Sequence, residues 1–309
     1  MRLGQANKKR RMFYKIFGRT YATEDTIVGW LFLIPATVLG LVFIIAPMLV
    51  SLSFAFTDAN LLRLDNVNWA GLDNFTRIFS DGTARKALLN SLEFVVKVVP
   101  LQLALALGLA LMLNARKRGS TFLRWVFFAP VMLSLAVTAF LWMNLLNPQT
   151  GLINALLEQF GIARQQFLRS PSQALNVIVL ISAWQGAGFQ MLIFLAALKN
   201  IPAELFEAAY IDGATKPKAF LYITLPSILP TFSFVLITML IGAFRLVVQP
   251  MIMTNGGPID ATMTVSLYIY QQGITFRDVG YSSAIALVYT VIIATVALTL
   301  RRVFKEEKT

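Results

Sequence analysis

The sequence is dominated by long stretches that contain no charged side chain. They lie at residues 27–57, 98–115, 125–157, 170–198, 219–244 and 279–300. About 20 apolar residues are needed to cross the hydrocarbon core of a bilayer, and each stretch with its apolar flanks is long enough. We therefore expect an all-α membrane protein with six transmembrane helices, placed near residues 27–53, 88–113, 122–146, 174–198, 228–252 and 280–300.

The composition also indicates that lipid is the solvent of much of this chain. Hydrophobic residues make up 57% of the 309 residues and charged residues only 14%, whereas soluble domains are about one quarter charged. In a soluble protein the net charge of +12 would suggest a nucleic-acid partner. In a membrane protein, basic loops that stay in the cytoplasm explain the same charge.

Lysine and arginine are distributed unevenly between the two sides of the expected helices. Eighteen lie in the two terminal segments, 1–26 and 301–309, and in loops 114–124 and 199–227, against seven in the three opposite loops. By the positive-inside rule, both termini and these two loops are expected to be cytoplasmic. In sequence, the two terminal segments flank a transmembrane domain at residues 27–300.

The N-terminal region admits two interpretations. Residues Lys8–Arg19 mix basic and aromatic side chains, which is typical of an interfacial helix on the inner leaflet but equally of a basic tail that enforces topology. The first apolar stretch that follows is longer than the core of a signal peptide, so we expect a retained helix.

The sequence lacks the residues that most enzymes and ion-driven carriers use. It contains no His and no Cys, no phosphate-binding GxxxxGK[ST] loop and no GxSxG nucleophile motif. Few carboxylates fall within the spans, although a proton-driven pump is expected to bury acids along its path. We therefore expect no catalytic residue, no metal site and no cofactor in this chain, and a partner that supplies the driving energy.

The cytoplasmic loop 199–227 has the features of a short helical hairpin. Pro202 suits the start of a helix, and Glu204 and Glu207 lie near its positive end. Gly213 can end that helix in a left-handed conformation, and a second helix can run from Lys218 towards Pro226. Such a hairpin across the cytoplasmic face could transmit force.

The spacing within this loop resembles the EAA loop of binding-protein-dependent ABC importer permeases. The matching residues are Glu207-Ala208-Ala209, Gly213 and Ile223-x-Leu225-Pro226. The resemblance implies a type I importer permease fold in the bacterial inner membrane. It also implies that this loop docks on an ATPase that binds ATP and magnesium, through Glu207, Ala208, Ala209, Asp212 and Gly213.

Other segments are similar to the carbohydrate branch of the same family. The most specific are Gly71-Leu72-Asp73-Asn74-Phe75 and Thr254-Asn255-Gly256-Gly257-Pro258 with Thr262, and the chain resembles the partner type of the larger maltose permease subunit, without its long insertion. The resemblance implies a heterodimer with a second permease subunit, two ATPase subunits, an extracytoplasmic binding protein and a carbohydrate substrate.

The resemblance also implies sugar contacts in the fourth span, at Trp184, Gln185, Gly186 and Phe189. On a helix, Gln185 and Phe189 share a face, with Trp184 beside it. The alternative is that the two aromatic residues pack in the core and the glycines permit close helix crossing.

The fifth span adds Arg245 and Gln249, four residues apart and on one face of a continuous helix. At positions that match polar sugar contacts in the maltose relative, this chain has Ala243 and Leu246, so a maltose-like substrate is in doubt. A cation at this depth needs water, an acidic residue of a partner or an anionic substrate such as glycerol phosphate or a uronate. A self-sufficient channel or secondary carrier is the alternative from another class, and the EAA loop argues against it.

Overall fold

The computed structural model describes residues 13–16, 19–63, 65–115 and 118–306, and it divides the chain into two units at Phe54. In the first unit, strands β1 (Phe13–Ile16) and β2 (Arg19–Ala22) form an antiparallel pair. The interfacial-helix interpretation of Lys8–Arg19 is therefore wrong for 13–16 and 19, and its other residues lie outside the described ones.

The first unit continues as one long apolar helix. It consists of α1 (Thr23–Gly40), a π-helical turn (Leu41–Ile45) and α2 (Ala46–Phe54). Within this unit none of the residues from Val28 to Phe54 is buried, and the segment is apolar enough to cross a membrane.

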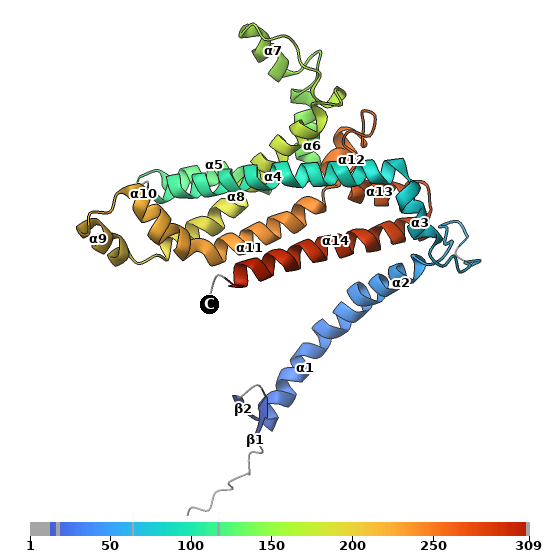
Figure 1. Cartoon of the computed structure of the whole chain (residues 1–309), viewed down its shortest axis with the longest axis horizontal. Coiled ribbons are helices and arrows are strands. Elements are labelled where there is room, and N and C mark those ends of the chain that lie inside the picture. Colours follow the sequence, from blue (N-terminus) through green and yellow to red (C-terminus); the bar gives the residue numbers. More distant parts are fainter. Residues whose placement is uncertain (1–12, 17–18, 64, 116–117, 307–309) are drawn as a thin grey trace, which may run out of the picture. The chain divides into compact units, whose positions relative to one another are not determined.

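The second unit is a bundle whose long helices lie side by side (Figure 1). These helices are α4 (Gly82–Ala115), α8 (Ala174–Lys199), α11 (Leu225–Phe244) and α14 (Val279–Glu306). The shorter helices of this unit include α3 (Asp73–Ser80), α7 (Leu152–Gln159), α9 (Ala203–Ile211), α10 (Lys216–Ala219), α12 (Val248–Met253) and α13 (Val265–Tyr270). Single turns of 3₁₀- or π-helix lie at Phe167–Arg169, Phe220–Thr224 and Gln271–Thr275.

The sequence predicts one continuous span near 122–146, but the structure breaks it into α5 (Ser120–Met132) and α6 (Leu135–Leu145), which are bent by 95°. Leu133 adopts an extended conformation, and the Ser134 hydroxyl caps α6 by accepting a hydrogen bond from the Val137 amide at 3.2 Å. Within the described residues there are five long apolar helices, or six with this bent pair as one span. The fold is thus the expected all-α membrane fold.

Close helix packing depends on particular glycines. A Cβ at Gly188 of α8 would lie 2.2 Å from the Phe127 carbonyl oxygen of α5, so only glycine allows these two backbones to approach. Around this contact and along α4, the side chains of Met191, Phe194 and Ile228 are completely buried. A second apolar cluster surrounds Phe94 and Tyr281.

A cluster of polar side chains links three helices at the end of the bundle where α4 begins. The Asp81 carboxylate accepts hydrogen bonds from the hydroxyls of Tyr268 at 2.5 Å and Tyr281 at 2.7 Å, and from the Thr83 and Ala84 amides. Burial raises the pKa of Asp81, but these hydrogen bonds outweigh it and hold the pKa below its ordinary value. The cluster therefore joins α4 to α13 and α14 through one ionised carboxylate.

Candidate functional site

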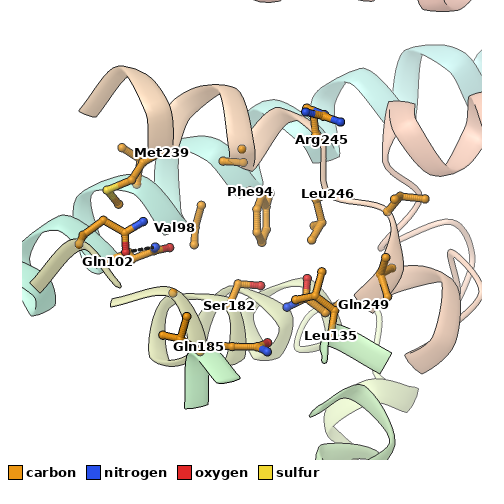
Figure 2. Close-up of a pocket in the computed structure, with 18 of the residues that line it drawn as sticks. Phe94, Val98, Gln102, Leu135, Ser182, Gln185, Met239, Arg245, Leu246 and Gln249 are labelled. Atoms are coloured by element: carbon orange, nitrogen blue, oxygen red, sulfur yellow. Dashed lines mark hydrogen bonds between the residues drawn. The ribbon is translucent and has the colours of Figure 1, made fainter. Parts of the chain in front are cut away.

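A cavity of about 390 Å³ lies among the helices of the second unit, and we call it the central cavity (Figure 2). Residues of α4, α8, α11 and the start of α12 line it, together with the junction of α5 and α6 and the break between α11 and α12. The lining residues are Phe94, Val98, Val99, Gln102, Val131, Leu133, Leu135, Ser182, Gln185, Gly186, Gln190, Thr238, Met239, Gly242, Ala243, Arg245, Leu246, Val247, Val248 and Gln249. Four of the six predicted pathway residues are therefore in one place.

Gln185 is held rigidly in the wall of this cavity. Its side-chain amide donates to the Leu133 carbonyl oxygen at 3.1 Å and to the Thr138 hydroxyl at 3.0 Å. Its Oε1 is buried and has no hydrogen-bond partner among the described residues, and the same holds for Oγ of Ser182. Because an unpaired buried polar atom is costly, these two oxygens are poised to bind a ligand or water.

Gly186 has no side chain, and the space beside it is occupied by the side chain of Gln102. A Cβ at Gly186 would lie 2.2 Å from Nε2 of Gln102, so glycine at this position leaves room for the Gln102 side chain to cross from α4 to α8 in this conformation. There Gln102 Nε2 donates to Gln190 Oε1 at 3.1 Å. With Gln249 of α12, the cavity therefore offers amide groups from four glutamines on three helices.

Arg245 and Gln249 line the same cavity, but they do not share the face of one continuous helix as predicted. Helix α11 ends at Phe244 and α12 begins at Val248, so Arg245 lies in a non-helical break. Figure 2 places Arg245 across the cavity from Gln185. Arg245 is exposed, and among the described residues its guanidinium has no ion pair or hydrogen bond. It is also the only charged residue in the lining.

The predicted aromatic residues lie elsewhere. Trp184 is 40% exposed and Phe189 53% exposed, and neither lines the central cavity. The Trp184 ring packs edge-on against Trp142 of α6, with 5.6 Å between the ring centroids. In the isolated chain the two aromatic residues thus lie outside the cavity that contains the polar groups. Sequence reasoning missed Ser182, Gln102 and Gln190, whose only signal is that they are polar residues in apolar spans.

The predicted coupling residues lie on or just after α9. The Ala214 amide donates to the Ala209 carbonyl oxygen at 2.8 Å and the Gly213 amide to that of Tyr210 at 3.1 Å, which is a Schellman motif. Gly213 has a φ of +81°, as this motif requires. Asp212 is the C-cap residue.

Helix α9 buries no side chain against the rest of the chain. Glu207 and Ala208 are exposed, and Ala209 is half-buried. The apolar side chains of Leu205 and Ile211 are 48% and 86% exposed. An isolated helix of nine residues is unstable in water, so a helix with this exposed apolar surface is suited to docking on another protein.

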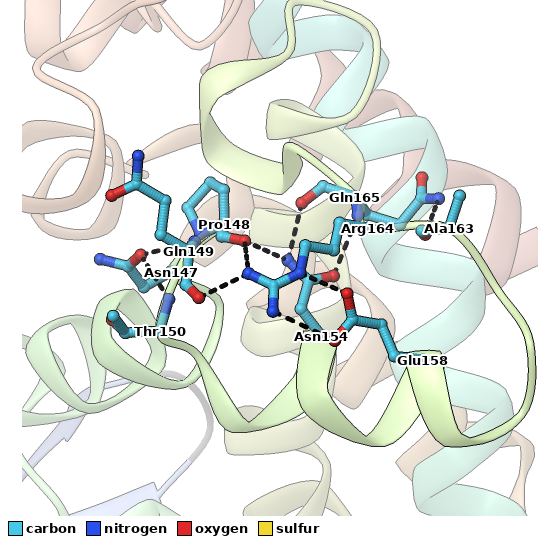
Figure 3. Close-up of polar contacts among 9 residues, drawn as sticks. All are labelled: Asn147, Pro148, Gln149, Thr150, Asn154, Glu158, Ala163, Arg164 and Gln165. Atoms are coloured by element: carbon cyan, nitrogen blue, oxygen red, sulfur yellow. Dashed lines mark hydrogen bonds and ion pairs between the residues drawn. The ribbon is translucent and has the colours of Figure 1, made fainter.

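Beyond α6, a loop that contains α7 is braced by polar contacts (Figure 3). The Arg164 guanidinium pairs with Glu158 and donates to the Gln149 carbonyl oxygen at 2.6 Å. The buried Asn154 amide donates to the carbonyl oxygens of Pro148 and Gln165 at 3.2 and 2.9 Å. These contacts give a polar surface loop a fixed shape.

A second cavity of about 390 Å³ lies where this loop meets the segment after α12, and we call it the loop cavity. It is lined by Met143, Leu146, Asn147, Pro148, Leu168, Arg169, Met253, Thr254, Gly257 and Pro258. Part of its wall is the Thr254–Pro258 motif, where the completely buried Thr262 hydroxyl donates to the Gly257 carbonyl oxygen at 2.8 Å.

Comparison with known proteins agrees with this architecture. Residues 102–306 match the family of binding-protein-dependent transport system inner membrane components. The chain is 37% identical to the probable ABC transporter permease protein YesP of Bacillus subtilis, over 90% of each chain. It is 35% identical to the lactose transport system permease protein LacF of Rhizobium radiobacter, over 87% of this chain and 90% of LacF.

A solved structure has the same fold. A chain of a bacterial ABC transporter involved in the import of the acidic polysaccharide alginate superposes with a TM-score of 0.82 at 25% identity, covering 92% of this chain and 96% of that one. The chain described here therefore belongs to the family of binding-protein-dependent ABC importer permeases, within its carbohydrate branch, and is a multi-pass transport subunit rather than an enzyme.

Proposed function

We propose that this chain forms half of the pathway through which an oligosaccharide or sugar derivative enters a bacterial cell. The observation that carries the proposal is the central cavity, in which the buried oxygens of Ser182 and Gln185 lack partners. Sugar hydroxyls donate to such oxygens, and the Gln249 and Gln102 side chains add further polar groups to the wall. The relatives named for lactose and alginate support a carbohydrate.

The second permease subunit would complete the pathway. Trp184 and Phe189 are exposed on this chain, so they could face substrate only where a partner subunit encloses them. An extracytoplasmic binding protein delivers the substrate. The chain lies in a bacterial inner membrane, and both of its termini are on the cytoplasmic side. Two ATPase subunits bind ATP and magnesium, and this chain binds neither.

Helix α9 would couple the pathway to those ATPases. Its exposed apolar side chains and the tight turn at Gly213 suit a groove on an ATPase subunit. The chain continues directly from α9 through α10 into α11, which ends beside Arg245. A movement of α9 can therefore reach the wall of the cavity as a rigid-body motion, which is alternating access.

Replacement of Glu207 tests this coupling. Glu207→Arg reverses the charge of an exposed side chain that has no described hydrogen bond or ion pair, so the chain should still insert in the membrane. We expect fewer ATPase subunits to co-purify with the variant and carbohydrate uptake to fall. Asp65→Arg, an exposed acid far from α9 in sequence, is the control. Full recovery of the ATPase subunits and full uptake with Glu207→Arg would contradict the assignment.

A further inference from the structure

The central cavity and the loop cavity share an electrostatic feature, which a third and mostly apolar cavity lined by Arg85 also has. Each is lined by one charged residue, which is an arginine, Arg245 in the central cavity and Arg169 in the loop cavity. Both are exposed, and neither guanidinium has an ion pair or a hydrogen bond among the described residues. A cavity with one cation and no anion has a positive potential and concentrates anions.

The same two helices join the cavities. Leu135 at the start of α6 lines the central cavity, and Met143 near its end lines the loop cavity, eight residues further along. At a rise of 1.5 Å per residue these positions are about 12 Å apart. On α12, which packs against α6, Gln249 lines the central cavity and Met253 the loop cavity. An oligosaccharide of a few units spans such a distance.

The rest of each lining suits a sugar chain with an acidic group. The central cavity adds the free oxygens of Ser182 and Gln185 for hydroxyl groups, whereas Arg245 lies on the opposite side. In the loop cavity, the Asn147 carboxamide oxygen already accepts the amides of Gln149 and Thr150, and Arg169 is the one cationic side chain of the lining. A guanidinium binds a carboxylate or sulfate through paired hydrogen bonds.

From these observations we infer that the substrate is an acidic oligosaccharide, and that Arg169 in the loop cavity is a first subsite from which it passes to Arg245 in the central cavity. The inference rests on the proposed import function and adds the charge of the substrate and a second binding position. The uncharged remainder of both linings implies that acidic groups on the substrate, and not its hydroxyls, distinguish it from neutral sugars.

The test compares charged and neutral forms of one sugar chain. The complete complex, reconstituted in vesicles with its binding protein, would be supplied with oligogalacturonates and with their methyl esters, in which each carboxylate is neutralised by one added methyl group. We expect the acids to stimulate ATP hydrolysis and uptake, and the esters to do so far less. Equal or better response to the esters would overturn the inference. No response to any carbohydrate would overturn the proposed function itself.

Variants then test the two arginines separately. Arg169→Gln and Arg245→Gln should each raise the concentration of acidic oligosaccharide that gives half-maximal uptake roughly tenfold or more, which is the effect of losing a charge-assisted hydrogen bond. Arg169→Lys and Arg245→Lys should retain part of the wild-type affinity, because lysine keeps the charge but not the planar pair of donors. Arg63→Gln, an exposed arginine that lines neither cavity, is the control. Unchanged uptake with Arg169→Gln would overturn the first subsite. Loss of the second permease subunit from the Arg245→Gln complex would show instead that Arg245 pairs with an acid of that partner.

Discussion

Substitution of Gly213 tests whether the left-handed backbone conformation after α9 is needed for coupling to the ATPase. Gly213 has a φ of +81°, and a Cβ added there would meet no atom within 4 Å. The cost of a side chain is therefore conformational alone, about 1–2 kcal/mol for Ala, less for Asn and more for the β-branched Val. We expect transport coupling to decrease in the order Gly, Asn, Ala, Val.

The chain contains a matched control for this strain. Gly161, just after the end of α7, has a φ of +74° and also has no atom within 4 Å of an added Cβ. Gly161→Val should cost the same local energy and leave the coupling intact. The assay is binding-protein-stimulated ATP hydrolysis and uptake by the reconstituted complex, normalised to assembled complex. Wild-type coupling in Gly213→Val, or equal losses in both variants, would refute the reasoning.

Three further outcomes follow from the structure. The purified single chain should hydrolyse no ATP above a mock preparation, because its sequence has no phosphate-binding loop; activity that co-elutes with the chain would contradict this. Gly188→Ala should lower the melting temperature of the complex, because its Cβ would lie 2.2 Å from the Phe127 carbonyl oxygen and overpacking costs about 1–3 kcal/mol. Gly108→Ala is the control, since an added Cβ there meets open space and should leave the melting temperature unchanged. Equal melting temperatures for the two variants would contradict the close packing. The ionised Asp81 stabilises the fold at pH values above its ordinary pKa of 3.8, and this stability is lost as the pH falls through the lowered pKa of the folded chain. Asp81→Asn should therefore flatten the acid end of a plot of melting temperature against pH. An unchanged plot would contradict this.

The sequence was sufficient for the architecture because lipid imposes a simple rule. A segment in hydrocarbon must satisfy its backbone hydrogen bonds internally, so long charge-free runs become helices. The break at Leu133 and the end of α11 before Arg245 could not be predicted in the same way. Each depends on the conformation of one or two residues, and the surrounding sequence remains apolar through both.

The candidate site was only partly predictable for a related reason. Gln185, Gly186, Arg245 and Gln249 stand out as polar or small residues in apolar spans, and all four line the central cavity. The partnership of Gln102 with Gln190 joins positions far apart in the chain, and it emerges only when α4 packs against α8. The edge-on packing of Trp184 on Trp142 likewise depends on the bend that places α6 beside α8.

Solvent access to the central cavity tests the pathway most directly, and the absence of cysteine makes the measurement clean. Ser182→Cys places one thiol in the cavity wall, and Ala106→Cys places one at a completely buried position as the control. In the reconstituted complex, we predict that a membrane-impermeant thiol reagent labels Cys at 182 at a rate that changes with ATP and falls when transported carbohydrate is present. A thiol at 182 that stays as unreactive as the one at 106 in every state, or that carbohydrate never protects, would contradict a substrate pathway through this cavity.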